Sequence, residues 1–184
     1  MIVKRLWWLI AVALGVALLA GCTTMTPNEC KVANWTEVGL RDGLAGEPLS
    51  VLNDRVRDCA EAKVAVDTPR YLQGRDQGLV SYCRLDNAVR VALDGKSYRG
   101  VCPVAVEGEF RRRFSVGREV YEARGDLRTL EARRTTLESR LRDAKTDEER
   151  RRIRDELTDL DRDMRRARDR LRDAEANLDR MRWR

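Results

Sequence analysis

The sequence predicts a mainly α-helical protein in which a small domain stapled by disulfides is followed by a long antiparallel helical hairpin of coiled-coil type. Apolar residues recur at steps of three and four through the last third of the chain, which is the spacing of a coiled-coil seam. Of the five cysteines, all but Cys22 lie between the N-terminal leader and this seam. Charged residues make up 37% and aromatic residues 5% of the chain, which favours extended helices over one compact core.

Residues 1–21 are predicted to be a signal peptide. Lys4 and Arg5 give it a positively charged start, and the uncharged run from Leu6 to Ala20 is shorter than the roughly 18 to 20 residues that span a bilayer. The run ends in the sequence LAGC, which closes with Cys22. This ending resembles the lipobox of bacterial lipoproteins. An uncleaved membrane anchor with an incidental cysteine is the alternative.

The lipobox resemblance implies that the Cys22 thiol receives a diacylglycerol, that the leader is removed, and that the new amino terminus is acylated with fatty acids such as palmitate. Several chains give a lasting anchor, because each buried methylene contributes about 0.8 kcal/mol. Thr23, in place of an aspartate, favours the outer membrane under the sorting rule of that family. We therefore expect a lipid anchor on the periplasmic face of the outer membrane, with residues 22–29 as a lipidated tether.

The remaining cysteines are an even number, Cys30, Cys59, Cys83 and Cys102, and predict two disulfides in an oxidising periplasm. Four cysteines allow three pairings, among which we favour Cys30 with Cys59 and Cys83 with Cys102. A metal site is the rival interpretation. Its ligands usually come in closely spaced pairs, and the chain has neither such a pair nor a histidine. No metal and no cofactor are predicted.

The disulfide-stapled domain is expected to span residues 30–108 and to contain several short helices. Asn34 is a candidate cap for a first helix that ends at Gly43 or Gly46. Glu47 and Pro48 are expected to open a second helix, which buries residues at helical spacing, Leu49, Leu52, Val56 and Cys59.

A third helix is predicted from Thr68 and Pro69 through Tyr82. It carries Gly74 and Gly78, four residues apart. Glycine inside a helix costs about 0.8 to 1 kcal/mol relative to alanine, so this spacing indicates close contact with another helix. A tolerated kink is the alternative.

Spaced glycines, aromatics and cysteines form three groups in the first two thirds of the chain: Trp35, Gly39, Asp42 and Gly43; Tyr71, Gly74, Arg75, Gly78, Leu79, Tyr82 and Cys83; Gly95, Tyr98, Gly100, Val101 and Cys102. Together they resemble an uncharacterised family of proteobacterial lipoproteins that carries a domain of unknown function. The resemblance covers about Cys30 to Tyr121. It implies lipidation and a shared fold, and it implies no activity.

Residues 109–184 are predicted to form the hairpin. One apolar stripe runs from Val116 to Ala144 with Arg134 at its single gap, and a second runs from Ile153 to Met181 without a gap. A straight helix would place the two stripes on opposite faces, so we expect a turn near residues 145–147. Thr146 and Glu149 match a capping box there. An intermolecular coiled coil is the alternative, because the spacing does not identify the partner helix.

The sequence favours a binding or structural function over an enzymatic one. The chain has no histidine for the common triads, and no nucleophile-elbow or phosphate-loop spacing. The net charge of +6 is too small to favour nucleic acid. Arg111, Arg112 and Arg113 lie beside Phe110 and Phe114 and are a possible anion contact. The aromatic pair, with Tyr121, is expected to pack the base of the hairpin against the disulfide domain.

Two functional hypotheses follow from these patterns. The first is an envelope lipoprotein with a structural or interaction role, whose hairpin contacts another envelope protein; an oligomer is an open alternative. The second is a module that binds an anionic envelope polymer or glycan, such as lipopolysaccharide or peptidoglycan, through its arginines.

Overall fold

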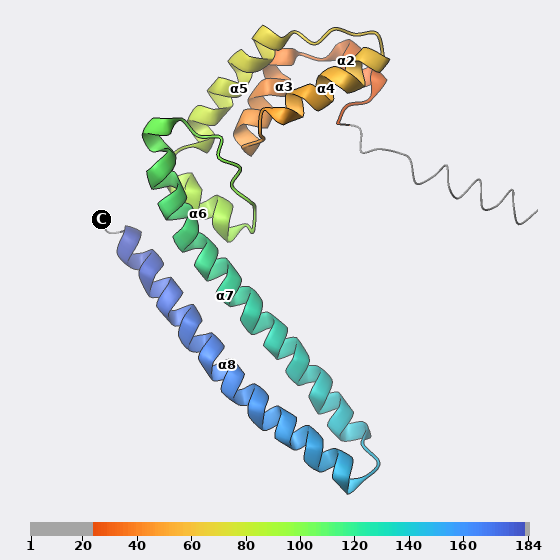
Figure 1. The fold of residues 1–184 in the computed structure, drawn as a ribbon, viewed down its shortest axis with the longest axis vertical. Helices are drawn as coiled ribbons and strands as arrows, with labels where there is room; N and C mark the ends of the chain where they lie inside the picture. Colours follow the sequence, from red (N-terminus) through yellow and green to blue (C-terminus); the bar gives the residue numbers. More distant parts are fainter. Residues whose placement is uncertain (1–23, 183–184) are drawn as a thin grey trace, which may run out of the picture. The chain divides into compact units, whose positions relative to one another are not determined.

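The computed structural model describes residues 24–182, which form helices and no strand (Figure 1). The predicted leader and Cys22 lie outside the described residues. The mainly α-helical fold and the C-terminal hairpin are confirmed. The helices are α2 (Pro27–Val32), α3 (Trp35–Ala45), α4 (Ser50–Glu61), α5 (Thr68–Tyr82), α6 (Leu85–Leu93), α7 (Val104–Asp143) and α8 (Asp147–Arg182).

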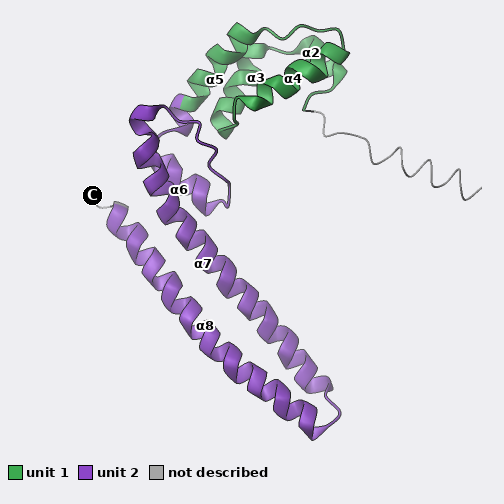
Figure 2. Ribbon diagram, viewed as in Figure 1, with its two compact units in different colours: residues 1–79 green, residues 80–184 purple. Residues whose placement is uncertain are grey.

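The chain divides into two compact units, Met1–Leu79 and Val80–Arg184 (Figure 2). This division differs from the boundary between residues 108 and 109 that the sequence suggested. The physical reason is that α6 packs along α7, so the segment before the hairpin belongs to the same unit as the hairpin itself. Each of the two disulfides lies within one unit.

The packing of α3 against α5 organises unit 1. The two helices meet at glycines, and a Cβ added to Gly39 would lie 1.9 Å from the carbonyl oxygen of Tyr71. A Cβ added to Gly74 would lie 1.9 Å from the carbonyl oxygen of Thr36. Gly43 and Gly78 make similar approaches, so the predicted close helix contact is confirmed, with glycines on both helices.

The buried face of α4 differs from the predicted apolar stripe. Leu52 and Cys59 are buried as expected, but Leu49 is 51% exposed and Val56 is 42% exposed. Two charged residues, Arg55 and Asp58, are buried in their place. The apolar spacing was wrong here because these charges have hydrogen-bonding partners inside unit 1.

The base of unit 2 is held by aromatic packing. Phe110 is fully buried, and its ring centroid lies 4.7 Å from that of Tyr98 and 5.6 Å from that of Tyr82. Phe114 contacts Tyr98 at 5.9 Å between centroids. The disulfide between Cys83 and Cys102 closes the segment that carries Tyr98. The aromatic residues of α7 pack against this closed segment, as predicted.

The hairpin is formed by α7 and α8, which run antiparallel and pack along their length (Figure 1). Their seam buries the two predicted stripes, including Val120 with Ala174 and Leu137 with Ile153. The turn lies between Asp143 and Asp147, where the Oγ1 of Thr146 accepts the N–H of Glu149 at 3.2 Å. The apolar stripes of the two helices therefore pack against each other within one chain.

Candidate functional site

The predicted disulfides are present with the favoured pairing. Cys30 is bonded to Cys59 in unit 1, and Cys83 is bonded to Cys102 in unit 2. Within residues 24–182 no cluster of histidine, cysteine or acidic side chains is arranged to hold a metal ion. In the same part of the chain, no helix has the length and apolar character needed to cross a membrane.

The three consecutive arginines do not form one cationic patch, because successive residues of a helix point about 100° apart. Arg111 pairs with Glu107 and lies over the ring of Tyr98, with its guanidinium carbon 5.2 Å from the ring centroid. Arg112 and Arg113 instead share Glu109, at nitrogen to oxygen distances of 3.1 and 2.9 Å. The predicted anion contact is therefore divided between two faces of α7.

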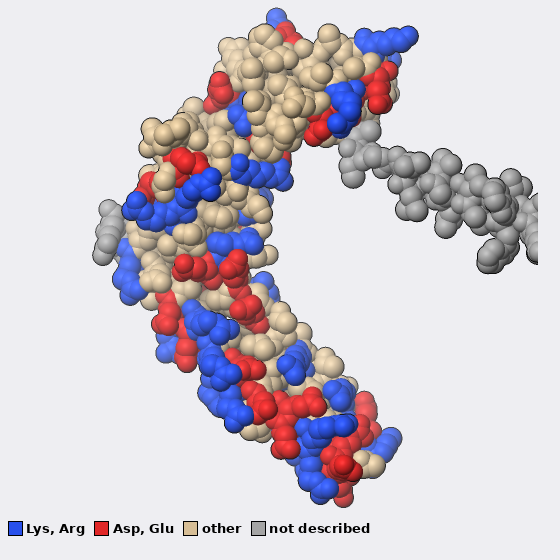
Figure 3. All heavy atoms as spheres, in the orientation of Figure 1, with Lys and Arg blue, Asp and Glu red and all other residues tan. Residues whose placement is uncertain are grey.

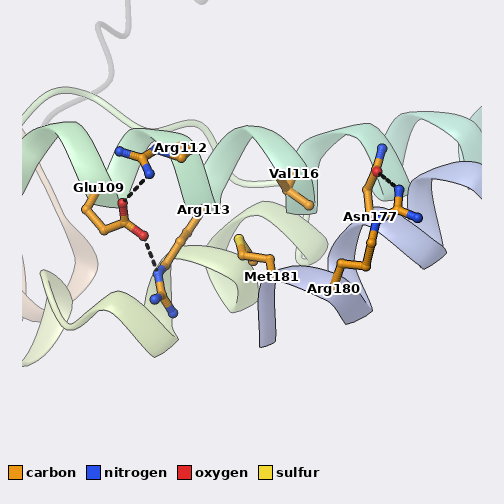
Figure 4. A pocket seen from close by; sticks show the side chains of 7 residues that line it. All are labelled: Glu109, Arg112, Arg113, Val116, Asn177, Arg180 and Met181. Atoms are coloured by element: carbon orange, nitrogen blue, oxygen red, sulfur yellow. Dashed lines mark hydrogen bonds and ion pairs between the residues drawn. The ribbon is translucent and has the colours of Figure 1, made fainter. Parts of the chain in front are cut away.

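Arg112 and Arg113 line a groove of about 450 Å³ between α7 and α8 (Figure 4). Val116 and Met181 supply its apolar surface, and Arg180 extends from α8 with its guanidinium bonded to the side chain of Asn177. The seven lining residues are Glu109, Arg112, Arg113, Val116, Asn177, Arg180 and Met181.

The groove has the chemistry of an anion site with an apolar wall. Its lining holds three arginines and one carboxylate, that of Glu109, which pairs with Arg112 and Arg113, so the lining carries an excess of positive charge. Guanidinium groups bind carboxylates and phosphates through paired N–H donors. The α8 contribution, Asn177 and Arg180, was missed from the sequence. The observed packing of Val120 with Ala174, extended by two turns of each helix, brings Arg113 opposite Met181, the end of α8 that carries these two residues.

A second set of contacts fixes the N-terminal segment of unit 1. The Oδ2 of Asp58 accepts three hydrogen bonds, from the backbone N–H of Thr24 at 2.6 Å, the hydroxyl of Thr24 at 2.8 Å and the N–H of Met25 at 3.3 Å. The Nη1 of Arg55 donates to the carbonyl oxygen of Thr24 at 3.4 Å. We call these four residues, Thr24, Met25, Arg55 and Asp58, the N-terminal latch.

The latch fixes part of the segment that the sequence predicts to be a lipidated tether. Met25 is only 6% exposed, and α2 begins two residues later. Hydrogen bonds from the Thr24 hydroxyl and backbone, followed by that from Met25, lower the pKa of Asp58. Within the predicted lipidated tether of residues 22–29, Thr24 and Met25 are therefore bound to α4. The polar partners lie in α4, more than thirty residues along the chain, and apolar spacing gives no sign of them.

A buried network holds Arg55 in place. Its Nε and Nη2 atoms donate to the two carboxylate oxygens of Asp42 at 2.9 and 2.7 Å, and the hydroxyl of Tyr71 donates to the same carboxylate at 2.7 Å. Asp42 is 3% exposed and Tyr71 is 0% exposed. Burial, and then the bond to Asp42, raises the pKa of Tyr71. Asp42 thus bridges three helices, α3, α4 and α5.

Residues 34–119 match a family described as "Protein of unknown function (DUF2799)". The matched segment contains the Asp42 network, the four packing glycines and the two latch residues of α4, and it ends within α7. Thr24, Met25, Cys30 and the whole of α8 lie outside it. Neither a curated protein nor a solved structure matches the chain.

Proposed function

We propose that this protein is a lipoprotein of the cell envelope, anchored through acylated Cys22 on the periplasmic face of the outer membrane, with a structural or protein-interaction role. The hairpin would be its contact region. The leader and lipobox-like sequence support the anchor, and two disulfides suit an oxidising compartment. The observation that carries the interaction role is the hairpin itself, a long paired element with a strongly charged surface.

The outer surface of the hairpin suits a polar partner. On the face drawn in Figure 3, side chains of both charges alternate along α7 and α8. Many form ion pairs one turn apart, such as Arg134 with Glu138 and Arg172 with Asp169. Exposed pairs of this kind contribute only about 0 to 1 kcal/mol, so their charges can be exchanged for those of a partner at little cost.

The anchor is tested by mass spectrometry of the membrane-extracted protein. We expect an N-terminus at Cys22 that carries acyl chains, and loss of membrane association in Cys22→Ala. An intact leader in the purified protein, or unchanged membrane retention of Cys22→Ala, would contradict the anchor.

The interaction role is tested by photo-crosslinking in cells from exposed hairpin positions, such as Arg151 and Arg165. We expect an envelope protein to be captured from the charged outer face. A residue of the buried seam, such as Leu160, is the control position that should capture nothing beyond the chain itself. Recovery of self-crosslinks alone would contradict an interaction with another envelope protein and would indicate self-association.

The groove favours a second candidate function, the binding of an anionic envelope polymer or glycan. The test is retention on purified lipopolysaccharide or cell wall. Binding should be sensitive to salt and should fall in the triple variant Arg112→Gln, Arg113→Gln and Arg180→Gln. Arg111→Gln is the matched control, because Arg111 is adjacent in sequence but does not line the groove. Retention that ignores both salt and the triple variant would exclude this function.

A further inference from the structure

We propose that the face of unit 1 around Thr24 and α2 is a membrane-contact surface, which the N-terminal latch holds against phospholipid headgroups. This inference rests on the proposed acylation of Cys22 and adds to it a defined orientation. The alternative geometry is a domain that moves freely at the end of its anchor. The two geometries differ in how much chain separates the acylated residue from the folded unit.

The length of that chain decides between them. Cys22 and Thr24 are two residues apart, so their Cα atoms can be separated by at most about 7 Å. The headgroup layer on each side of a bilayer is itself about 5 to 7 Å thick. A free tether over residues 22–29 would reach about 25 Å and clear this layer. With the latch closed, the surface at Thr24 must lie at the level of the headgroups.

Hydrogen bonds and a disulfide keep the latch closed. Asp58 is 8% exposed and receives three donors from Thr24 and Met25, so release would leave a largely buried carboxylate without those partners. Arg55 is fixed by its paired bonds to buried Asp42. The disulfide between Cys30 and Cys59 ties α2 covalently to the same helix, α4.

The chemistry of the surface beside the latch matches a phospholipid partner. Val32, the last residue of α2, is 84% exposed, and the cationic side chain of Lys31 precedes it. Val32 lines a hollow together with Thr24, Met25 and the exposed Arg41. The acid in that lining, Glu29, is occupied by the N–H and hydroxyl of Thr26. An exposed apolar side chain flanked by cations suits the interface of an anionic membrane.

The experiment places a tryptophan at the proposed contact and measures its depth. The acylated full-length protein carrying Val32→Trp is reconstituted in vesicles of phosphatidylcholine and a minor share of phosphatidylglycerol, with brominated phosphatidylcholine as quencher. The emission of the parent protein is subtracted to remove its own tryptophans. We expect a roughly twofold loss of the added emission, as for a side chain at the headgroup boundary.

Two variants test the latch. Asp58→Ala removes the acceptor of Thr24 and Met25 and should restore most of the emission of Val32→Trp. Asp54→Ala is the matched control, since Asp54 is on the same helix but pairs with Arg57, and it should leave quenching unchanged. A flexible Gly-Ser insertion after Thr23 provides a second variant that keeps every latch residue. It should also relieve quenching, because it lengthens the chain before the latch.

The outcomes separate the two proposals. Acylated protein without quenching at Val32→Trp would overturn the contact surface and leave the lipid anchor standing. Quenching that persists with the insertion and in Asp58→Ala would overturn the role of the latch. A mass spectrum without acyl chains would overturn the anchor and this inference together.

Discussion

Single glycines set how closely α3 and α5 pack, and this gives the sharpest residue-scale test. Gly39→Ala would place a methyl group 1.9 Å from a backbone carbonyl oxygen, which a side-chain rotation cannot relieve. We expect a loss of about 3 kcal/mol or more in the free energy of unfolding, measured by urea denaturation. Gly108→Ala in α7 is the control, because its new Cβ would meet nothing within 4 Å. That variant should be about 1 kcal/mol more stable than the parent. Similar effects at both sites would refute the packing argument.

Tyr98 gives a pH-dependent prediction at the same scale. Its hydroxyl donates to Glu107 and accepts the N–H of Cys102 at 3.1 Å. Burial, and then the bond to Glu107, raises the pKa of Tyr98 to about 12. The stabilisation is therefore present below about pH 10, the pKa of a free tyrosine, and is lost as pH rises through the folded value.

The measurement is an NMR titration of the Tyr98 ring. We expect a late transition in the parent protein and an earlier one in Glu107→Gln, which removes the negative charge facing the hydroxyl. A transition at the same pH in both proteins would show that Glu107 does not contribute to the shift.

At the scale of elements, the sequence predicted helices well where their ends carry side-chain signals. The amide of Glu37 donates to Asn34 at the start of α3, and Gly46 closes that helix with a positive φ. The inner face of α4 was mispredicted for a physical reason. Arg55 finds its partner 13 residues earlier and Asp58 finds one 34 residues earlier, so no local pattern reveals that these charges are satisfied inside.

The hairpin yields the prediction for this scale. Arg134 occupies an apolar position of the stripe between Leu130 and Leu137, yet its side chain is 47% exposed and bonded to Glu138. Arg134→Leu should complete the seam and raise the free energy of unfolding by about 1 kcal/mol. Arg133→Leu, on the exposed side of the same turn, is the control and should give no gain. Equal effects in thermal denaturation would show that position 134 does not face the seam.

For the whole molecule, the disulfides follow the two units. Cys30 and Cys59 are 29 residues apart, and Cys83 and Cys102 are 19 apart. Replacing either pair with alanines should lower the stability of its own unit by about 3 kcal/mol. The longer loop should cost only about 0.4 kcal/mol more, because loop entropy grows with the logarithm of length. Hydrogen exchange, read separately for residues 24–79 and 80–182, measures both losses. A loss below 1 kcal/mol for either pair, against the roughly 3 kcal/mol expected, would contradict this entropic role.

The division into units was not visible in the sequence. Residues 30–108 seemed one domain because cysteines and short helices run through them without a change of composition. The division between the two units falls inside α5, between Leu79 and Val80, where the helix continues without a break and neither a proline nor a charge run marks it. The groove likewise could not be predicted, because it depends on the register of α7 against α8. The sequence identified only the arginines of α7.

The repeating seam of the hairpin makes its reach adjustable. Each seven-residue repeat adds about 10.5 Å of helix, and neighbouring repeats use the same kind of contact. Removing one repeat from α7 and its facing repeat from α8 keeps the turn, the aromatic base and the alignment of the remaining layers. Selection can thus match the distance spanned by this protein to the spacing of its surroundings by paired deletions or duplications, without redesigning either end.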